Sequence, residues 1–138
     1  MIHDLRVNSH GYPGSFEGSE EENIRKWDRI LKRMEFLFWE ANEDTCRKKN
    51  PYDKEHDLAR EEFTAKYGMF GEKLKTEEEI AREKREHTHR LYMMSDVPEY
   101  AQISEKWLAA EGELREYRDR CLKQGMELMT KYFRNLWD

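Results

Sequence analysis

The sequence has few cysteines, no long apolar run and no segment that resembles a secretion signal. Its two cysteines, Cys46 and Cys121, are far apart, and neither has a Cys or His neighbour at zinc-finger spacing. No apolar run reaches the roughly 18 residues that suggest a membrane span. We therefore expect a reducing, cytoplasmic setting and no membrane partner.

An excess of basic residues is also missing. The formal net charge is −5, and Lys and Arg are scattered among Asp and Glu, so nucleic acid is not expected as a partner. Charged residues make up 40% of the chain and hydrophobic residues only 37%, a balance that approaches that of disordered chains. The 12% of aromatic residues and a clear apolar periodicity instead indicate a folded chain with a heavily solvated surface. Its 138 residues fit one domain, 1–138.

None of the segments has the pattern of a strand, and four have helical spacing. Ser19 and Glu22 have capping-box spacing, and apolar residues follow at three- and four-residue steps from Ile24 to Ala41. Thr76 and Glu79 repeat the capping signature. After an N-terminal loop at 1–18, the predicted helical segments are 19–49, 53–74 with a break near Gly68, 76–94 and 97–137. The predicted fold class is an all-α helical bundle.

The last segment predicts a helix that is long for a compact monomer of this size. One apolar side of it forms a seam at three- and four-residue steps. The seam consists of Tyr100, Ile103, Trp107, Ala110, Leu114, Tyr117, Cys121 and Leu128. Further on, the apolar positions Leu122, Met126, Met129 and Phe133 follow a 3.6-residue period, which indicates a change of packing partner. Because the seam needs cover, we expect a homo-oligomer.

Glycine interrupts this helix at Gly112 and Gly125. Each position permits either a bend or close helix crossing, or ordinary tolerance of a glycine.

Several aromatic residues are candidates for contact with a partner. Phe36 and Trp39 lie off the main apolar face of the first helix, so that helix must be buried on two sides, either by a partner or another copy or within a wide monomeric core. Large aromatic side chains also contribute much of the binding energy at protein interfaces. The interface candidates are Phe36, Trp39, Trp107, Leu114, Tyr117, Phe133 and Trp137.

Three motifs occur together in one order. They are His10-Gly11-Tyr12-Pro13, then Trp27-Asp28-x-Ile30-Leu31-x-x-Met34 with Phe38, and finally Lys131-Tyr132-Phe133-x-x-Leu136-Trp137-Asp138. With them the chain resembles, from residue 10 onward, a family of small helical bacteriophage and prophage proteins whose activity is not established. The resemblance implies a phage context and an accessory role, in which the chain binds a host protein, a viral component or a signalling nucleotide.

Nucleotide binding would need Arg or Lys for phosphate and an aromatic ring for the base. Two groups in the sequence offer both residue types. The ligand-binding candidates are Arg115 and Arg118 with Tyr117, and Arg82 and Arg85 with Tyr92. The alternative for each arginine is ordinary pairing with a neighbouring glutamate on a helix surface.

Metal-dependent catalysis has weaker support. Three pairs have ligand spacing: Glu86 with His89, Asp53 with His56, and Glu40 with Glu43. The first two supply half of a di-iron site at most, and the third lacks the Glu-x-x-Asp that an all-α nucleotide pyrophosphatase carries on its next helix. The sequence also has no Gly-x-Ser-x-Gly elbow. We therefore expect no catalytic residue, metal or cofactor.

Taken together, these patterns predict a phage-encoded accessory binding protein in the infected bacterial cytoplasm. Its specific action would be inhibition of host antiviral defence, either by sequestering a nucleotide signal or by binding a defence protein. A metal-dependent nucleotide hydrolase and a structural or assembly accessory of the virion are the alternatives.

Overall fold

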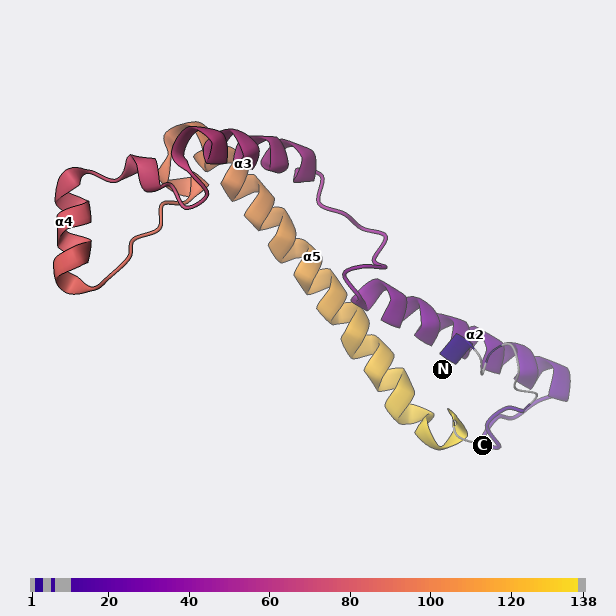
Figure 1. Ribbon diagram of the computed structural model, residues 1–138. Coiled ribbons are helices and arrows are strands. Elements are labelled where there is room, and N and C mark those ends of the chain that lie inside the picture. The colour runs from indigo at the N-terminus through magenta and orange to yellow at the C-terminus, as the bar shows by residue number, and fades with distance from the viewer. Residues whose placement is uncertain (1, 4–5, 7–10, 137–138) are drawn as a thin grey trace. The chain divides into compact units, whose positions relative to one another are not determined.

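The computed structural model describes residues 2–3, 6 and 11–136, and the regular structure in this part of the chain is helical (Figure 1). The four long elements are α2 (Glu20–Ala41), α3 (Asp53–Tyr67), α4 (Glu77–Glu86) and α5 (Pro98–Lys131). Short 3-10 turns are η1 (Glu72–Leu74), η2 (Met94–Asp96) and η3 (Phe133–Leu136). The predictions of an all-α fold and of a long C-terminal helix are confirmed.

The helices begin where the sequence indicates. Ser19 caps α2 with a capping box, in which its Oγ accepts from the Glu22 backbone N–H at 3.3 Å. Thr76 caps α4 by accepting from the Glu79 backbone N–H at 3.2 Å. Pro98 is the first residue of α5, a position where its missing N–H costs nothing. These starts depend on residues within one turn, so the sequence was enough to locate them.

The predicted end of the first helix is wrong. The helix stops at Ala41, and the segment 47–49 lies in the loop beyond it instead of in a last helical turn. The loop folds back because the Glu40 carboxylate accepts from both the backbone N–H and the Nε of Arg47, at 3.3 and 2.9 Å. The contact between the Glu40 side chain and the loop therefore ends the helix at Ala41, ahead of the predicted end at residue 49.

The next two segments are also shorter than predicted. α3 stops at Tyr67, and Gly68 follows with φ +89°, which confirms the break expected there. α4 ends at Glu86 because His87 takes the left-handed conformation, φ 53°, so Leu91 and Met94 do not lie on that helix. Met94 is instead buried in a core with Phe63 and Tyr100.

The contacts divide the chain into two compact units. Unit 1 comprises Met1–Lys49 with Leu114–Asp138, and unit 2 comprises Asn50–Glu113. Helix α5 contributes residues to both. The prediction of one domain stays a prediction.

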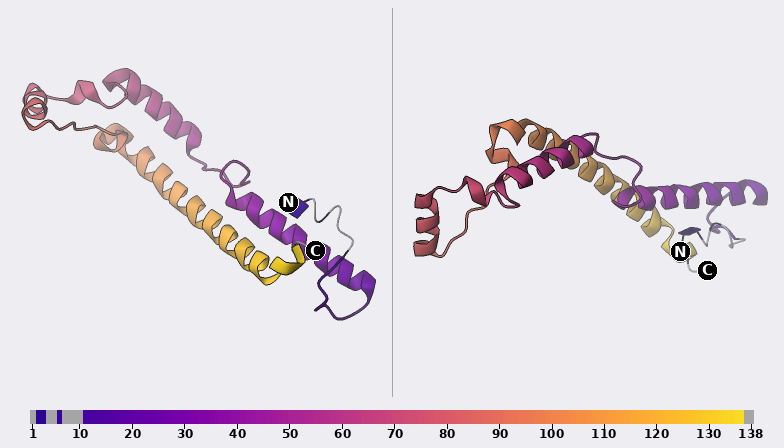
Figure 2. Two further views of the ribbon diagram at one scale, coloured as in Figure 1. Left: turned by 60° about the horizontal axis from the view of Figure 1, so that its bottom comes forward. Right: turned by 45° about the horizontal axis from the view of Figure 1, so that its top comes forward.

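In unit 1, α2 lies beside the C-terminal part of α5, as both views of Figure 2 show. Its core is formed by Trp27, Leu31, Met34, Tyr132 and Leu136. The loop before α2 also packs on this core, since Tyr12 and Phe16 contact it. The ring of Phe16 meets those of Trp27 and Tyr132 edge-on. The core therefore anchors α2 by one face and leaves its other side available for contacts.

In unit 2, α3 and the start of α5 enclose the smaller core. The Phe63 and Tyr100 rings meet edge-on at 6.1 Å between centroids. Gly71, with φ +66°, lets the chain pass close to Tyr92, whose backbone N–H donates to the Phe70 carbonyl at 3.0 Å.

The seam predicted on the last helix is covered by the chain itself. Every seam residue from Tyr100 to Leu128 is buried or half-buried, and Tyr100 and Cys121 are the most enclosed. The seam therefore does not demand a second molecule, contrary to the reasoning from helix length. Of the helices in the described residues, none is both long and apolar enough to cross a membrane.

Candidate functional site

The surface around Trp39 is the strongest candidate site in unit 1. Trp39 lies in the last turn of α2 and is 55% exposed, whereas Trp27 on the same helix is 5% exposed. The Trp39 carbonyl accepts from Thr45 Oγ1 at 2.5 Å, which ties the backbone below the indole to the loop. A large aromatic side chain is thus presented on an anchored backbone.

Two hollows flank Trp39, and both are lined by Trp39 and Glu35. The smaller, of about 290 Å³, is lined by Lys32, Glu35, Phe36, Trp39, Glu40 and Arg47. The larger, of about 500 Å³, is lined by Ile2, His3, Glu35, Phe38, Trp39, Asn42, Thr45 and Met129. The indole therefore stands between two shallow depressions in the surface.

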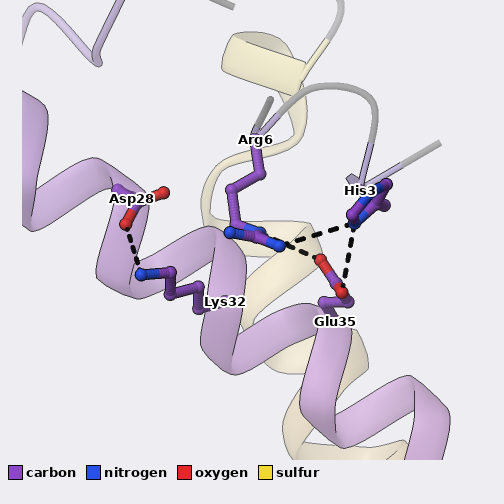
Figure 3. A network of polar contacts seen from close by, with 5 residues as sticks. All are labelled: His3, Arg6, Asp28, Lys32 and Glu35. Carbon is purple, nitrogen blue, oxygen red and sulfur yellow. Dashed lines mark hydrogen bonds and ion pairs between the residues drawn. The ribbon is translucent and has the colours of Figure 1, made fainter. Parts of the chain in front are cut away.

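Glu35, in the lining of the larger hollow, contacts the side chains of His3 and Arg6. Its two carboxylate oxygens lie 3.3 Å from His3 Nδ1 and 3.1 Å from Arg6 Nε (Figure 3). Burial acts to raise the pKa of Glu35, but the hydrogen bonds and positive charges of Arg6 and His3 outweigh it and lower that pKa. On the same helix, Asp28 and Lys32 form a separate ion pair at 3.0 Å.

Phe36 is half-buried between two cations. The Arg33 guanidinium lies 5.5 Å from the centre of its ring, and the Arg47 guanidinium lies 4.8 Å from it. Of these two cations only Arg47 lines the smaller hollow, where it pairs with Glu40 at 2.9 Å.

A buried glutamate supports the surface from below. Glu40 is 0% exposed, and its carboxylate accepts from Tyr117 Oη at 2.7 Å and from Arg47 Nε at 2.9 Å. Cys46 Sγ lies 3.8 Å from the same carboxylate. Burial acts to raise the pKa of Glu40, but the hydrogen bonds from Tyr117 and Arg47 outweigh it and lower that pKa. Sequence reasoning missed this cluster, because Glu40 resembles the other helix-surface carboxylates.

In the first predicted nucleotide-binding group, the tyrosine contacts residues from outside the group. The Tyr117 hydroxyl donates to Glu40, and this hydrogen bond, together with burial, raises the Tyr117 pKa. The cation over its ring is Lys48, with Nζ 3.9 Å from the centroid. Arg115 is exposed and Arg118 is half-buried. Their role in ligand binding stays a prediction.

The second predicted nucleotide group also has a carboxylate at its tyrosine. The Tyr92 hydroxyl lies 2.6 and 2.7 Å from the two oxygens of Glu79, and this contact raises the Tyr92 pKa. Arg90 lies over the Tyr92 ring at 4.5 Å, while Arg82 and Arg85 are exposed on α4. The role of this group likewise stays a prediction.

The remaining interface candidates are dispersed. Trp107, in unit 2, donates from Nε1 to Asp53 Oδ1 at 2.9 Å, and its ring stacks on His56 at 4.1 Å between centroids. Leu114 is half-buried, and Phe133 is 53% exposed in η3. Trp137 lies outside the described residues, as do His10 and Asp138 of the motifs.

The acidic pairs with ligand spacing are separated or engaged elsewhere. Because α4 ends at Glu86, that residue and His89 do not share a helix face. Glu40 is buried whereas Glu43 is exposed. Nowhere in 2–3, 6 and 11–136 do three His, Cys, Asp or Glu side chains gather closely enough to hold a metal ion.

Comparison of the chain with protein-family models, with curated proteins and with solved structures found no match. The candidate site is therefore defined by the geometry of this chain alone.

Proposed function

We propose that the chain is a binding protein that engages a partner protein through the surface around Trp39. The observation that carries this proposal is the 55% exposure of an anchored tryptophan between two hollows. Tryptophan is enriched among the residues that dominate protein interfaces, because its large rigid ring buries much apolar area at little entropic cost.

The surroundings of Trp39 suit a protein surface. The larger hollow is bordered by the apolar side chains of Ile2, Phe38 and Met129, which can receive an apolar side chain of a partner. The smaller hollow combines the Phe36 ring with both cationic and acidic side chains, Lys32 and Arg47 with Glu35 and Glu40, which suits a mixed polar and apolar protein surface.

A protein partner fits the geometry better than a nucleotide. In both predicted nucleotide groups the tyrosine hydroxyl contacts a carboxylate, Glu40 for Tyr117 and Glu79 for Tyr92. A carboxylate beside the ring repels the phosphate of a nucleotide whose base stacks there.

The resemblance to phage proteins adds the setting. In the cytoplasm of an infected bacterium, the specific action we propose is inhibition of antiviral defence by binding a defence protein. No step of this action needs turnover of a substrate.

Self-association is the second part of the proposal. Exposed apolar side chains on α5, at Leu122 and Met126, support it, since they remain uncovered within unit 1. The protein would then act as a homo-oligomer.

Photo-crosslinking tests the binding surface. Trp39 is replaced by p-benzoylphenylalanine, with the same replacement at Ile24 as control, because Ile24 is 43% exposed on the same helix. We expect irradiation of phage-infected cells to give a partner adduct at Trp39 that is absent at Ile24, and mass spectrometry would identify a host protein. Equal adducts at both positions would refute the surface.

The same experiment separates the alternatives. An adduct with a virion protein would indicate the assembly role, and an adduct of twice the chain mass would indicate contact between copies. An intact nucleotide released by denaturing the purified wild type would instead indicate that the protein sequesters a nucleotide signal.

A further inference from the structure

One face of α5 in unit 1 is apolar and exposed. Leu122 and Met126 are one helical turn apart and are 46% and 48% exposed, and Met129, which is half-buried on the core of unit 1, borders them. The side of α5 toward α2 holds Tyr117, whose hydroxyl contacts Glu40, and Gly125, which approaches the Phe38 ring. This part of α5 thus has one apolar face against α2 and a second one open to solvent.

We infer that a second copy of the chain covers this open face, with the two α5 helices antiparallel. The register that buries the row places Leu122 opposite the partner's Met129, and the two-fold axis then passes between Gly125 and Met126. Met126 packs beside the partner's Met126 in this arrangement. Such an interface is isologous: both copies contribute the same short row of residues, and each row covers the other.

The charges beside the row support a second copy as the occupant. Lys123 and Glu127 are exposed on α5, and neither side chain has an ion pair or hydrogen bond to the described part of the chain. In the proposed register, Lys123 lies within one residue of the partner's Glu127, and symmetry repeats the pair.

This self-complementarity distinguishes a second copy from another partner. An acidic or a basic protein would attract only one of Lys123 and Glu127 and repel the other, whereas an antiparallel copy satisfies both. Like charges do not face one another at Lys123 or Glu127 in this register.

The inference rests on the proposed self-association and specifies its surface. The contact from Leu122 to Met129 spans roughly 10 Å of helix, which is small for a permanent dimer. We therefore expect a dimer that dissociates on dilution and weakens as salt rises.

The first test measures native mass by light scattering over a range of concentrations. The wild type should approach twice the monomer mass, and the variant Leu122→Glu with Met126→Glu should remain monomeric. Leu108→Glu is the matched control, because Leu108 is 58% exposed on the same helix but belongs to unit 2. Circular dichroism checks that each variant keeps its helix content.

The second test establishes the register by mixing charge variants. Lys123→Glu places Glu opposite Glu, and Glu127→Lys places Lys opposite Lys, so each variant alone should dimerise about tenfold more weakly than the wild type. A mixture of the two restores opposite pairs at both positions and should recover wild-type affinity. Contacts within a single chain cannot produce this recovery, because each variant chain carries two like charges at positions 123 and 127 whether or not the other variant is present.

The outcomes separate the inference from the proposed function. A monomeric wild type would overturn both the self-association and this interface, while leaving the Trp39 crosslink to decide partner binding. A dimer that survives Leu122→Glu with Met126→Glu, or a mixture that fails to recover affinity, would overturn the α5 interface alone.

Discussion

At the scale of single residues, the hydrogen bond from Tyr117 to the buried Glu40 should contribute measurably to stability. Tyr117→Phe removes the donor and leaves the carboxylate with fewer partners, so the free energy of unfolding should fall by about 1–3 kcal/mol. Denaturant unfolding measures the change. Tyr132→Phe is the matched control, because Tyr132 is buried in the same unit without a hydroxyl hydrogen bond to the described residues. An equal loss in both variants would contradict the role of Glu40.

The same carboxylate should make stability depend on pH. The folded-state pKa of Glu40 lies below its ordinary value of 4.5, so its contribution to stability is present above that value and is lost as the pH falls through the folded pKa. Glu40→Gln should therefore be less stable than the wild type at neutral pH, and the difference should narrow as the pH falls below 4.5. Urea unfolding across this range measures it, with Glu43→Gln as the exposed control. A constant difference would refute the linkage.

At the scale of elements, the two glycines within α5 should respond oppositely to alanine. A Cβ at Gly112 meets nothing within 4 Å, so Gly112→Ala should stabilise the helix by about 0.5–1 kcal/mol. At Gly125 a Cβ would lie 3.2 Å from the Phe38 ring, so the gain should be reduced or reversed. Thermal unfolding of the two variants measures the contrast. Equal stabilisation would show that α5 and α2 do not need the close approach at Gly125.

At the scale of the whole molecule, α5 should couple the two units during unfolding. Phe63 is 3% exposed in the core of unit 2, and Phe63→Ala should cost about 3–5 kcal/mol. Because α5 runs without interruption through residues of both units, we expect amide hydrogen exchange to accelerate in unit 1 as well. Faster exchange confined to unit 2 would contradict the prediction of one domain.

The sequence by itself determined the helical class and the points where helices begin. Capping at Ser19 and Thr76, the proline at the start of α5 and the break at Gly68 depend on residues within a turn or two, so their physics is local. The apolar face of α2, which includes Trp27, could likewise be predicted from the spacing of apolar residues alone.

Only the tertiary structure decided which side chains are covered and where α2 ends. Glu40 is buried because Tyr117 and Arg47, distant or beyond the helix in sequence, supply its hydrogen bonds. Trp39 is exposed because the packing of α2 on α5 leaves its side of the helix uncovered, although its residue type is that of a core residue. Whether a side chain is buried depends on which segments meet in space. Helical periodicity predicts that a face is apolar, but it does not predict which segment packs against that face.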